Sequence, residues 1–401
     1  MVESVQPIVK PREDQLDCLV APYLRTCSGL GFAIGYASPS FANCGGLYFK
    51  GNIQNQFGLP LTLDGETPFE ISSITKTFTA TLYTLLIRAF DATKTIGDYI
   101  LPKGPMRISS TLAKIKLDEL VNYTSGLPSD NDDDTLATPP FWPQPFSMQH
   151  MLSFLDALPP CVSQTGKKFT YSNLAFAIMS AIIASHNGKP REGVFVNKIR
   201  EHIFDRLFLH GATFFDEVSL IDLPLGFHYE SWPASAYTAT QPGHALFPAH
   251  FGAGGIMATP NDMLKWLLFN MGITQDKQLT PLLPVLQTRS TCVTANGYQL
   301  GLGWFINPAC ANCSGSISKD GEDPGFSSYI AFLPSAKPGT IPSQAGAFVL
   351  VNADSFPAAA AVANDVLRIM QNKSPLADKS LYPKSAVSRS QVRYRRVRQF
   401  I

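Results

Sequence analysis

A serine and a lysine, Ser73 and Lys76, lie three residues apart in the segment FEISSITKTFTA. Apolar residues recur every three to four positions from Phe78 to Ala89, which predicts a helix that begins near the serine. Positions i and i+3 share a helix face, so the hydroxyl and the amine are expected side by side. Unpaired N–H groups at a helix start favour an oxyanion, and a neutral lysine can take a serine proton. The spacing predicts a nucleophilic serine, although it also fits a surface serine beside an extended lysine.

Two later segments carry polar triplets that extend this chemistry. The segment KKFTYSNLAFAIMS contains the triplet Y-S-N at 171–173, and ISKDGEDPGFSSYIAFLP contains K-D-G at 319–321, just before an expected strand. S-x-x-K followed by a second polar triplet and a K-T-G triplet is the motif set of serine β-lactamases and penicillin-binding proteins. Three motifs in order are far more specific than S-x-x-K alone.

On these residues the chain resembles the serine β-lactamase and penicillin-binding-protein superfamily. The match is to the branch of class C β-lactamases and D-alanyl-D-alanine carboxypeptidases, which uses Y-x-N and also contains β-lactamase-like esterases and acyltransferases. Three further stretches look like family landmarks: NYTSGLP (122–128), FGAGGIMATPNDM (251–263) and YQLGLGW (298–304). The resemblance covers roughly residues 15 to 372.

The resemblance assigns roles to the motif residues. It implies that Ser73 is the nucleophile that forms an acyl-enzyme, and that Lys76 and Tyr171 share the work of the general base, with the choice between them open. Asn173 is expected to bind Lys76 or a substrate amide. Lys319 is expected to support Tyr171 and the negative charge that develops in the transition state.

The oxyanion hole is expected to consist of the backbone N–H groups of Ser73 and Glu322, the residue after Gly321. Backbone donors depend little on the side chain, so a glutamate is compatible with this role. The expected substrate-binding residues are therefore Asn173, Asp320, Gly321 and Glu322. No cofactor is implied, and no HExxH or comparable cluster indicates a metal site.

The third triplet departs from the family pattern in a way that bears on the substrate. Asp320 stands where family β-lactamases usually have a neutral hydroxyl, and Glu322 and Asp323 follow at once. The last expected helix begins PAAAAV, without the arginine that class C β-lactamases usually carry there. Carboxylates at a rim repel an anionic substrate, so we expect a neutral or cationic ester, amide or thioester.

Expected strands lie towards both ends of the chain, and expected helices dominate the middle. This order predicts an α/β (α+β) protein with an antiparallel sheet, flanked by helices, that receives an inserted all-helical domain, which is the β-lactamase/transpeptidase-like architecture. We expect residues 1–90 and 290–372 to form the discontinuous sheet domain, 91–289 the helical domain and 373–401 a basic extension. Expected strands are 29–37, 45–52, 300–306, 327–334 and 346–353, and expected helices are 14–27, 148–157, 173–186, 194–208, 260–272 and 357–371.

Composition excludes several classes of protein. The 401 residues are 45% hydrophobic, which suffices for a large core, and no apolar run reaches the roughly 18 residues that span a bilayer. The N-terminus lacks the apolar stretch of a secretory signal, so we expect a cytoplasmic protein, or a secreted one if a leader was removed. Seven cysteines do not suggest a disulfide framework. The basic extension fits either an anionic partner or a solvated segment, and no nucleic-acid-binding motif supports the former.

We therefore expect a serine hydrolase of the β-lactamase-like esterase type that acts on a small-molecule substrate. An acyltransferase that passes the acyl group to an alcohol or amine shares every motif and stays an alternative. A non-catalytic binding protein of the same fold is the second alternative. It is disfavoured because all four catalytic residues are present: Ser73, Lys76, Tyr171 and Lys319.

Overall fold

The computed structural model describes most of the chain. The described residues are 7–25, 27–100, 108–129, 148, 151–152, 155, 166, 168–186, 189–191, 193–229, 237–239, 248–289, 297, 299–308, 315–334, 343–354 and 356–376. The basic extension from residue 377 onward, and most of the expected helix 148–157, lie outside the described residues. The division into a sheet domain and a helical domain stays a prediction.

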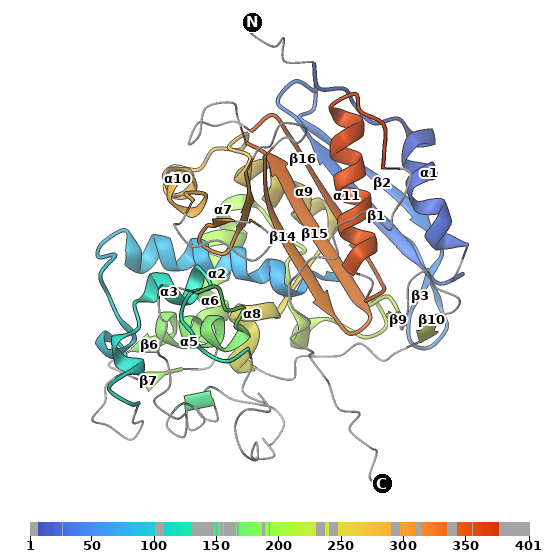
Figure 1. Ribbon diagram of the computed structural model, residues 1–401. Helices are drawn as coiled ribbons and strands as arrows, with labels where there is room; N and C mark the ends of the chain where they lie inside the picture. The colour runs from blue at the N-terminus through green and yellow to red at the C-terminus, as the bar shows by residue number, and fades with distance from the viewer. Residues whose placement is uncertain are drawn as a thin grey trace, which may run out of the picture.

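A seven-stranded antiparallel sheet, drawn from both ends of the chain, forms the centre of the molecule (Figure 1). The predicted antiparallel sheet is thereby confirmed, and so is the expected hairpin of the first two strands. The strands in spatial order are β12 (Gln299–Leu300), β13 (Phe305–Asn307), β14 (Ser316–Asp323), β15 (Phe326–Leu333), β16 (Ala345–Val351), β1 (Gly31–Ala37) and β2 (Gly45–Gly51).

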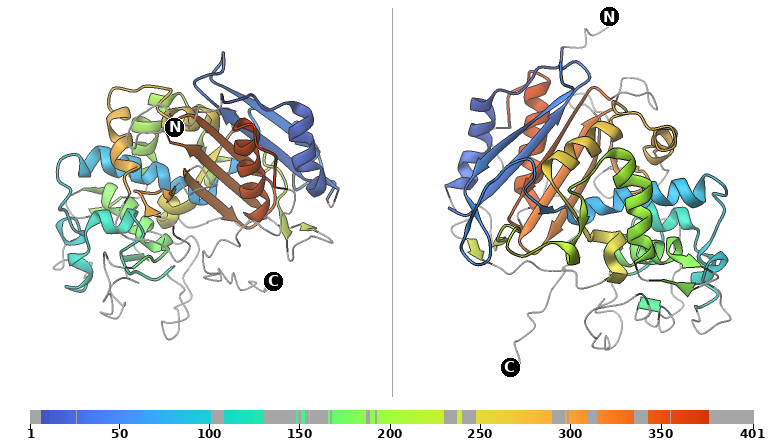
Figure 2. Two further views of the ribbon diagram at one scale, coloured as in Figure 1. Left: turned by 45° about the horizontal axis from the view of Figure 1, so that its top comes forward. Right: turned by 180° about the vertical axis from the view of Figure 1, so that it is seen from behind.

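Each face of the sheet buries a separate apolar cluster. Because side chains alternate along a strand, Tyr329 and Ala331 of β15 face the helices α1 (Glu13–Leu24) and α11 (Phe356–Met370). Ile330 and Phe332 face the opposite side, where α9 (Pro260–Asn270) packs on the sheet. Figure 1 shows α11 and α1 on the near side of the sheet. The right-hand view of Figure 2, seen from behind, shows α9 (yellow) on the opposite face.

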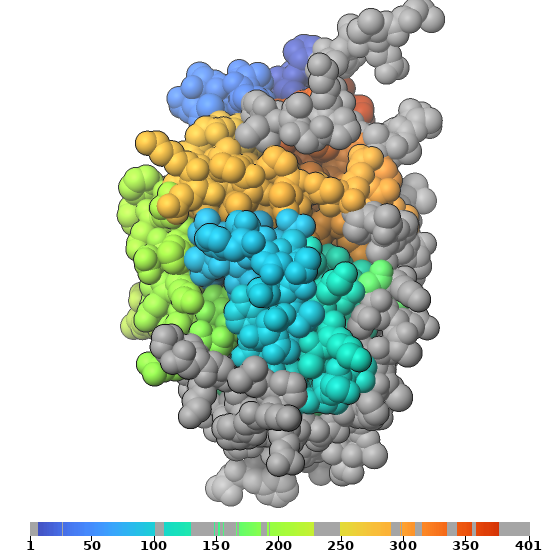
Figure 3. Space-filling model, turned by 90° about the vertical axis from the view of Figure 1, so that its left-hand side faces the viewer, coloured from blue at the N-terminus to red at the C-terminus, as the bar shows by residue number. Residues whose placement is uncertain are grey.

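Most of the remaining helices pack around α2, away from the β2 edge of the sheet. Figure 3 shows that side, where the residues after α2 (cyan) meet segments from the middle of the chain (green and orange). The helices are α2 (Thr75–Tyr83), α3 (Leu117–Val121), α5 (Asn173–Ile183), α6 (Val194–Ile199), α7 (Asp205–Leu207), α8 (Phe251–Gly254) and α10 (Leu283–Leu286), and π-helical turns Thr84–Arg88 and Arg200–Phe204 extend α2 and α6.

Short strands, which the sequence does not predict, complete the fold. A three-stranded sheet in the order β5-β11-β8 joins the segment before α2 to the middle of the chain. The other pairs are small hairpins. These strands are β5 (Phe69–Glu70), β11 (Ile256–Ala258), β8 (Thr213–Phe214), β3 (Ile53–Gln54), β4 (Pro60–Leu61), β6 (Ser185–His186), β7 (Lys189–Pro190), β9 (Phe227–Tyr229) and β10 (Tyr237–Ala239).

Two predictions near the C-terminal strands were wrong in detail. The expected strand 300–306 is two short strands, β12 and β13, because Gly303 has φ +77° and the Gly301 N–H bonds to the Trp304 carbonyl 2.9 Å away across a turn. The triplet at 319–321, expected just before a strand, lies inside β14. Its mixture of charge and glycine masked a strand that is fixed by its pairing with β15.

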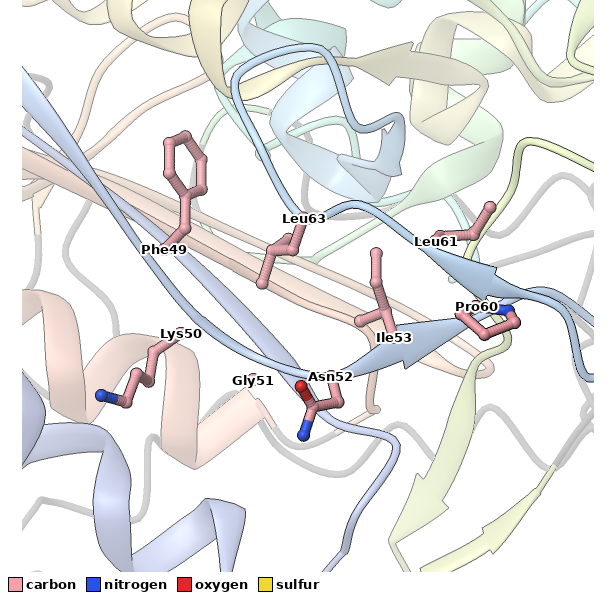
Figure 4. Close-up of a pocket in the computed structure, with 8 residues that line it drawn as sticks. All are labelled: Phe49, Lys50, Gly51, Asn52, Ile53, Pro60, Leu61 and Leu63. Atoms are coloured by element: carbon pink, nitrogen blue, oxygen red, sulfur yellow. The ribbon is translucent and has the colours of Figure 1, made fainter.

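A cavity of about 370 Å³ lies at the other edge of the sheet, between β2 and the β3–β4 hairpin (Figure 4). Three strands separate β2 from β14 in the sheet, each about 4.8 Å from the next. The cavity is therefore remote from the S-x-x-K segment. Its lining residues are Phe49, Lys50, Gly51, Asn52, Ile53, Pro60, Leu61 and Leu63.

Candidate active site

Ser73 lies at a strained turn between β5 and α2. The 3₁₀ turn Ser72–Ile74 leads directly into the helix, as the periodicity predicts. Ser72 has φ +48°, a left-handed conformation that is uncommon for residues other than glycine. The carbonyl of the preceding residue, Ile71, accepts a hydrogen bond from Ser328 Oγ of β15 at 2.9 Å. The sheet therefore holds the turn that presents the serine.

The three alternating threonines of the motif segment anchor α2. Thr79 Oγ1 donates to the Gly252 carbonyl at 2.7 Å, and Thr75 Oγ1 accepts from the Ile256 N–H at 3.2 Å. Thr77 Oγ1 accepts from the indole N–H of Trp266 in α9. All three threonines are buried. Their hydroxyls satisfy buried backbone and indole groups, which fixes the start of α2 against α8 and α9.

Lys76 connects three separate parts of the chain. Its Nζ donates to Ser73 Oγ at 2.8 Å, to Asn173 Oδ1 at 2.7 Å and to the Ala253 carbonyl at 2.7 Å. The side chain is fully buried. An ammonium group has three N–H donors, so these three acceptors match the charged form of the lysine.

The Y-S-N triplet reaches the same point from the start of α5. A hydrogen bond of 2.6 Å joins Tyr171 Oη and Ser73 Oγ. Ser172 caps α5, because its Oγ accepts from the Ala175 N–H at 3.0 Å. Because Ser172 supplies the cap, the side chain of Asn173 points towards Lys76 and accepts its hydrogen bond. The structure thus brings Ser73, Lys76, Tyr171 and Asn173 together as the motif order predicts, while their catalytic roles stay predictions.

Lys319 approaches the site from β14. It is fully buried, and its Nζ lies 5.4 Å from the centre of the Tyr171 ring. This amine donates hydrogen bonds to Asp320, at 2.6 Å to the carbonyl and 3.0 Å to Oδ1. Burial lowers the pKa of Lys319, and the Asp320 carboxylate opposes that shift. Lys319 therefore lies near the Tyr171 ring while it is paired with Asp320, and its support of Tyr171 in catalysis stays a prediction.

The part of β14 that follows Lys319 is open towards the site. In the described residues β13 pairs with residues 316–318 of β14, whereas residues 319–323 pair with β15 alone. Gly321 lies against the turn before the serine, since a Cβ built on it would stand 2.3 Å from the Ile71 carbonyl oxygen. Glycine is needed for this close approach. The oxyanion hole of the Ser73 and Glu322 N–H groups stays a prediction.

The acidic residues of β14 point to both faces of the strand, yet Asp320 and Asp323 lie close enough to raise the pKa of Glu322, so a rim that repels anionic substrates stays a prediction. Strand alternation puts Asp323 on the face of Lys319 and Gly321, and Glu322 on the face of its cross-strand partner Ser327. Partial desolvation by the surrounding chain and the carboxylates of Asp354, Asp320 and Asp323 raise the pKa of Glu322 to about 8. Because the Glu322 side chain is solvent-exposed, solvent screens this effect. Glu322 and Asp323 point to opposite faces because consecutive residues of a strand alternate in direction.

Three contributors to the site escaped the sequence analysis. Glu70 of β5 is buried, and burial together with the Asp323 carboxylate raises its pKa well above the ordinary range. The backbone carbonyl of Ala253 accepts a hydrogen bond from Lys76, and a residue of any type at position 253 would provide this carbonyl. Tyr123, from the stretch NYTSGLP, stacks on Tyr171. All three lie in segments that the sequence had singled out, but none of them was given a role there.

Among the described residues, no group of three or more His, Cys, Asp or Glu side chains is arranged to hold a metal ion. Within the same part of the chain, no helix has the length and apolarity required to cross a membrane.

Solved structures with this fold are numerous. The β-lactamase/D-alanine carboxypeptidase of Yersinia pestis, solved with citrate, superimposes with a TM-score of 0.66 at 21% identity, and the match covers 90% of this chain and 99% of that one. A class C β-lactamase of Rhodobacter sphaeroides gives a TM-score of 0.66 at 19% identity, with 89% and 99% covered. An octameric penicillin-binding-protein homologue of Pyrococcus abyssi gives 0.68 at 18% identity, with 90% and 78% covered. The β-lactamase/transpeptidase-like fold is confirmed.

Sequence comparison agrees with the fold. The chain is 26% identical, over 298 residues, to the D-alanyl-D-alanine-carboxypeptidase/endopeptidase AmpH of Escherichia coli K12, and the match covers 70% of each protein. The Beta-lactamase family model matches residues 50–370, which include the serine, tyrosine and lysine motifs described above. On this evidence the chain belongs to the beta-lactamase family.

Proposed function

We propose that this chain is a serine hydrolase that forms an acyl-enzyme at Ser73 with a neutral or cationic ester, amide or thioester. The observation that carries the proposal is the contact of Ser73 Oγ with both Lys76 Nζ, at 2.8 Å, and Tyr171 Oη, at 2.6 Å. A nucleophile within hydrogen-bond reach of two proton-transfer groups is the arrangement that covalent catalysis requires.

In the proposed acylation, Tyr171 is the base. Lys76 Nζ already contacts three acceptors, which suits an ammonium rather than a neutral amine. The ammonium groups of Lys76 and Lys319, 5.0 and 5.4 Å from the centre of the Tyr171 ring, stabilise the phenolate. The phenolate takes the hydroxyl proton as Ser73 Oγ bonds to the carbonyl carbon.

The tetrahedral intermediate then breaks down. Its oxyanion faces the backbone N–H groups of Ser73 and Glu322, and as the bond to the leaving group breaks, the Tyr171 phenol gives that group its proton. Deacylation repeats the cycle with water: Tyr171 takes the water proton, hydroxide adds to the acyl carbon, and Ser73 leaves with the proton returned. Each cycle restores the phenolate.

The substrate class follows from charge. Asp320 already pairs with Lys319, so the cation beside the open edge of β14 has its partner within the protein. Described residues 358–362 at the start of α11 read AAAAV and add no cation. An anionic substrate would approach without a free counter-charge from either element, and desolvating it there would cost more than desolvating a neutral one.

Intact-mass measurement tests the proposal. The wild type is incubated with an activated neutral ester, an acyl thioester, a cationic ester and a penicillin, and Ser73→Ala serves as the negative variant. Ser327→Ala is the matched control, since this serine is buried but faces the α11 side of the sheet. We expect an acyl adduct on wild type and Ser327→Ala with the neutral or cationic probes. An adduct that persists in Ser73→Ala, or none with any probe, would overturn the proposal.

The same experiment separates hydrolysis from acyl transfer. Adding an alcohol or amine acceptor to the acyl-enzyme yields the transferred product if an acyltransferase is at work, and only the free acid if water is the acceptor. AmpH is named for D-alanyl-D-alanine carboxypeptidase and endopeptidase activity. The penicillin arm shows whether the acyl-enzyme also forms with an anionic substrate.

A further inference from the structure

Tyr123 is a buried residue with a backbone conformation that needs an explanation. It has φ +63°, a left-handed conformation that bulky residues rarely adopt, and it is 1% exposed. A left-handed conformation costs a non-glycine residue free energy, so the surrounding structure must over-determine it. The tyrosine is therefore held in place by its contacts rather than by local preference.

The ring of Tyr123 lies between two other aromatic rings. It is nearly parallel to the Tyr171 ring, with a centre-to-centre distance of 5.6 Å and an interplanar angle of 12°. It is also nearly parallel to the Phe305 ring of β13, at 5.1 Å and 13°. Offset parallel stacking is a favourable geometry for aromatic pairs. The stack connects the sheet to the phenol that contacts Ser73.

The hydroxyl of Tyr123 is occupied by the turn between β12 and β13. It donates to the Gly303 carbonyl at 2.9 Å. Gly303 in turn packs on the backbone of α2, since a Cβ built on it would stand 2.9 Å from the Lys76 carbonyl oxygen. The ring of Tyr123 thus stacks on the ring of Tyr171, and its hydroxyl holds Gly303, which packs against the backbone at Lys76.

We propose that Tyr123 is a positioning residue that fixes the plane of the Tyr171 ring and so keeps the in-plane O–H bond and lone pairs of the phenol aimed at Ser73. The inference rests on the proposed function, because it gives Tyr171 a catalytic task. The stack supplies the ring plane, and the bond to Gly303 locks the stack in register with α2. A phenol ring that rotates about its Cγ–Cζ axis keeps its oxygen in place but turns the in-plane O–H bond and lone pairs away from the serine, and proton transfer depends on that alignment.

Two substitutions separate the stack from the hydroxyl. Tyr123→Phe keeps the ring and removes the bond to Gly303, whereas Tyr123→Leu removes the ring from the stack. The first readout is the rate of acylation of Ser73 by the activated ester in a single turnover. We expect a loss of about 10- to 100-fold for Tyr123→Leu, mainly in the acylation rate at saturating probe, and recovery to within about threefold for Tyr123→Phe.

The second readout does not depend on activity. In protein labelled with ¹³C in its tyrosine rings, Tyr171→Phe assigns the Tyr171 signals. We expect slow ring rotation in wild type and in Tyr123→Phe, and fast, averaged rotation in Tyr123→Leu. Thermal unfolding of each variant shows whether it is folded under these conditions.

The outcomes divide clearly. Slow rotation of Tyr171 in a folded Tyr123→Leu variant, or unchanged acylation by it, overturns the positioning role. An equal loss in the Phe and Leu variants, without rescue by the ring, also overturns it and assigns Tyr123 to stability alone. If wild type forms no adduct with any probe, the proposed function fails, and the rotation measurement still decides whether Tyr123 holds Tyr171.

Discussion

At the scale of single residues, the site is organised by how each buried charge is paired. Lys76 finds Asn173 and a backbone carbonyl, whereas Lys319 finds Asp320, the residue next to it in the chain. Because both lysines are fully buried, the identity of their partners decides which additional charges the site can accept.

Asp320→Asn is predicted to change the substrate preference. The substitution leaves Lys319 buried without its carboxylate, and a penicillin carboxylate can then supply the missing charge. We expect acylation by penicillin to increase by about tenfold or more relative to acylation by the neutral ester, a shift of about 1.4 kcal/mol. Competition between the two probes, followed by intact mass, measures the ratio. An unchanged ratio in a folded variant would contradict the role of Asp320.

Glu70→Gln is predicted to alter the dependence of stability on pH. The folded state holds the Glu70 proton to a higher pH than the unfolded chain does, since burial and Asp323 raise its pKa above the ordinary 4.5. The wild type should therefore lose unfolding free energy as pH rises from about 4.5 through that raised value. The variant should lose less over the same window. Denaturant unfolding at a series of pH values checks the slopes, and parallel curves would refute the prediction.

At the scale of elements, the site is a junction of a helix start and a strand edge. The turn before α2 meets β14 and β15 through backbone contacts at Ile71. The distance between the serine and the strand edge is therefore set by how closely two backbones approach, and only Gly321 permits that approach.

Gly321→Ala is predicted to separate β14 from the nucleophile. The added methyl group would stand 2.3 Å from the Ile71 carbonyl oxygen, so the backbone must shift. Loss of one oxyanion donor costs about 100-fold in rate, and we expect a loss of this order in the acylation rate.

Gly254→Ala is the matched control for that variant. A Cβ built on Gly254 meets its nearest neighbour, Asp323 Oδ2, at an ordinary 3.8 Å. Acylation by this variant should stay within about threefold of wild type. Equal losses in the two alanine variants would show that β14 is not the sensitive element.

At the scale of the whole molecule, one amide joins segments far apart in sequence. Asn352, fully buried after β16, donates to the carbonyls of Gly29 and Leu225 and accepts from the Gly31 N–H at 2.7 Å. It therefore ties the start of β1 and the segment before β9 to the end of the central sheet.

Asn352→Leu is predicted to destabilise the whole protein. Three backbone groups, of which the Gly31 N–H is fully buried, would lose their partner, and we expect a loss of about 2–5 kcal/mol in the free energy of unfolding. Asn364→Ala, which removes one bond to Ala360 within α11, should cost less than about 1 kcal/mol. Denaturant titration compares the two, and equal costs would contradict the tie.

The sequence by itself determined much of the site and the architecture. The apolar period after Ser73 predicted α2, and the order of the three motifs identified which tyrosine and which second lysine join the serine. The hairpin 29–37 and 45–52 and the last helix were also correct, because their signals are local: alternation, period and turn residues.

Only the tertiary structure decided which groups are paired and where charges point. The sequence shows three acidic residues close together, but strand alternation turns Glu322 and Asp323 to opposite faces. Sequence reasoning also missed the Ala253 carbonyl, the buried Glu70 and the stack of Tyr123 on Tyr171, since each depends on contacts between segments that are distant along the chain. Local pattern reports the preference of a segment for a conformation; the pairing of charges and rings is set by burial and distance, which exist only after the segments have packed together.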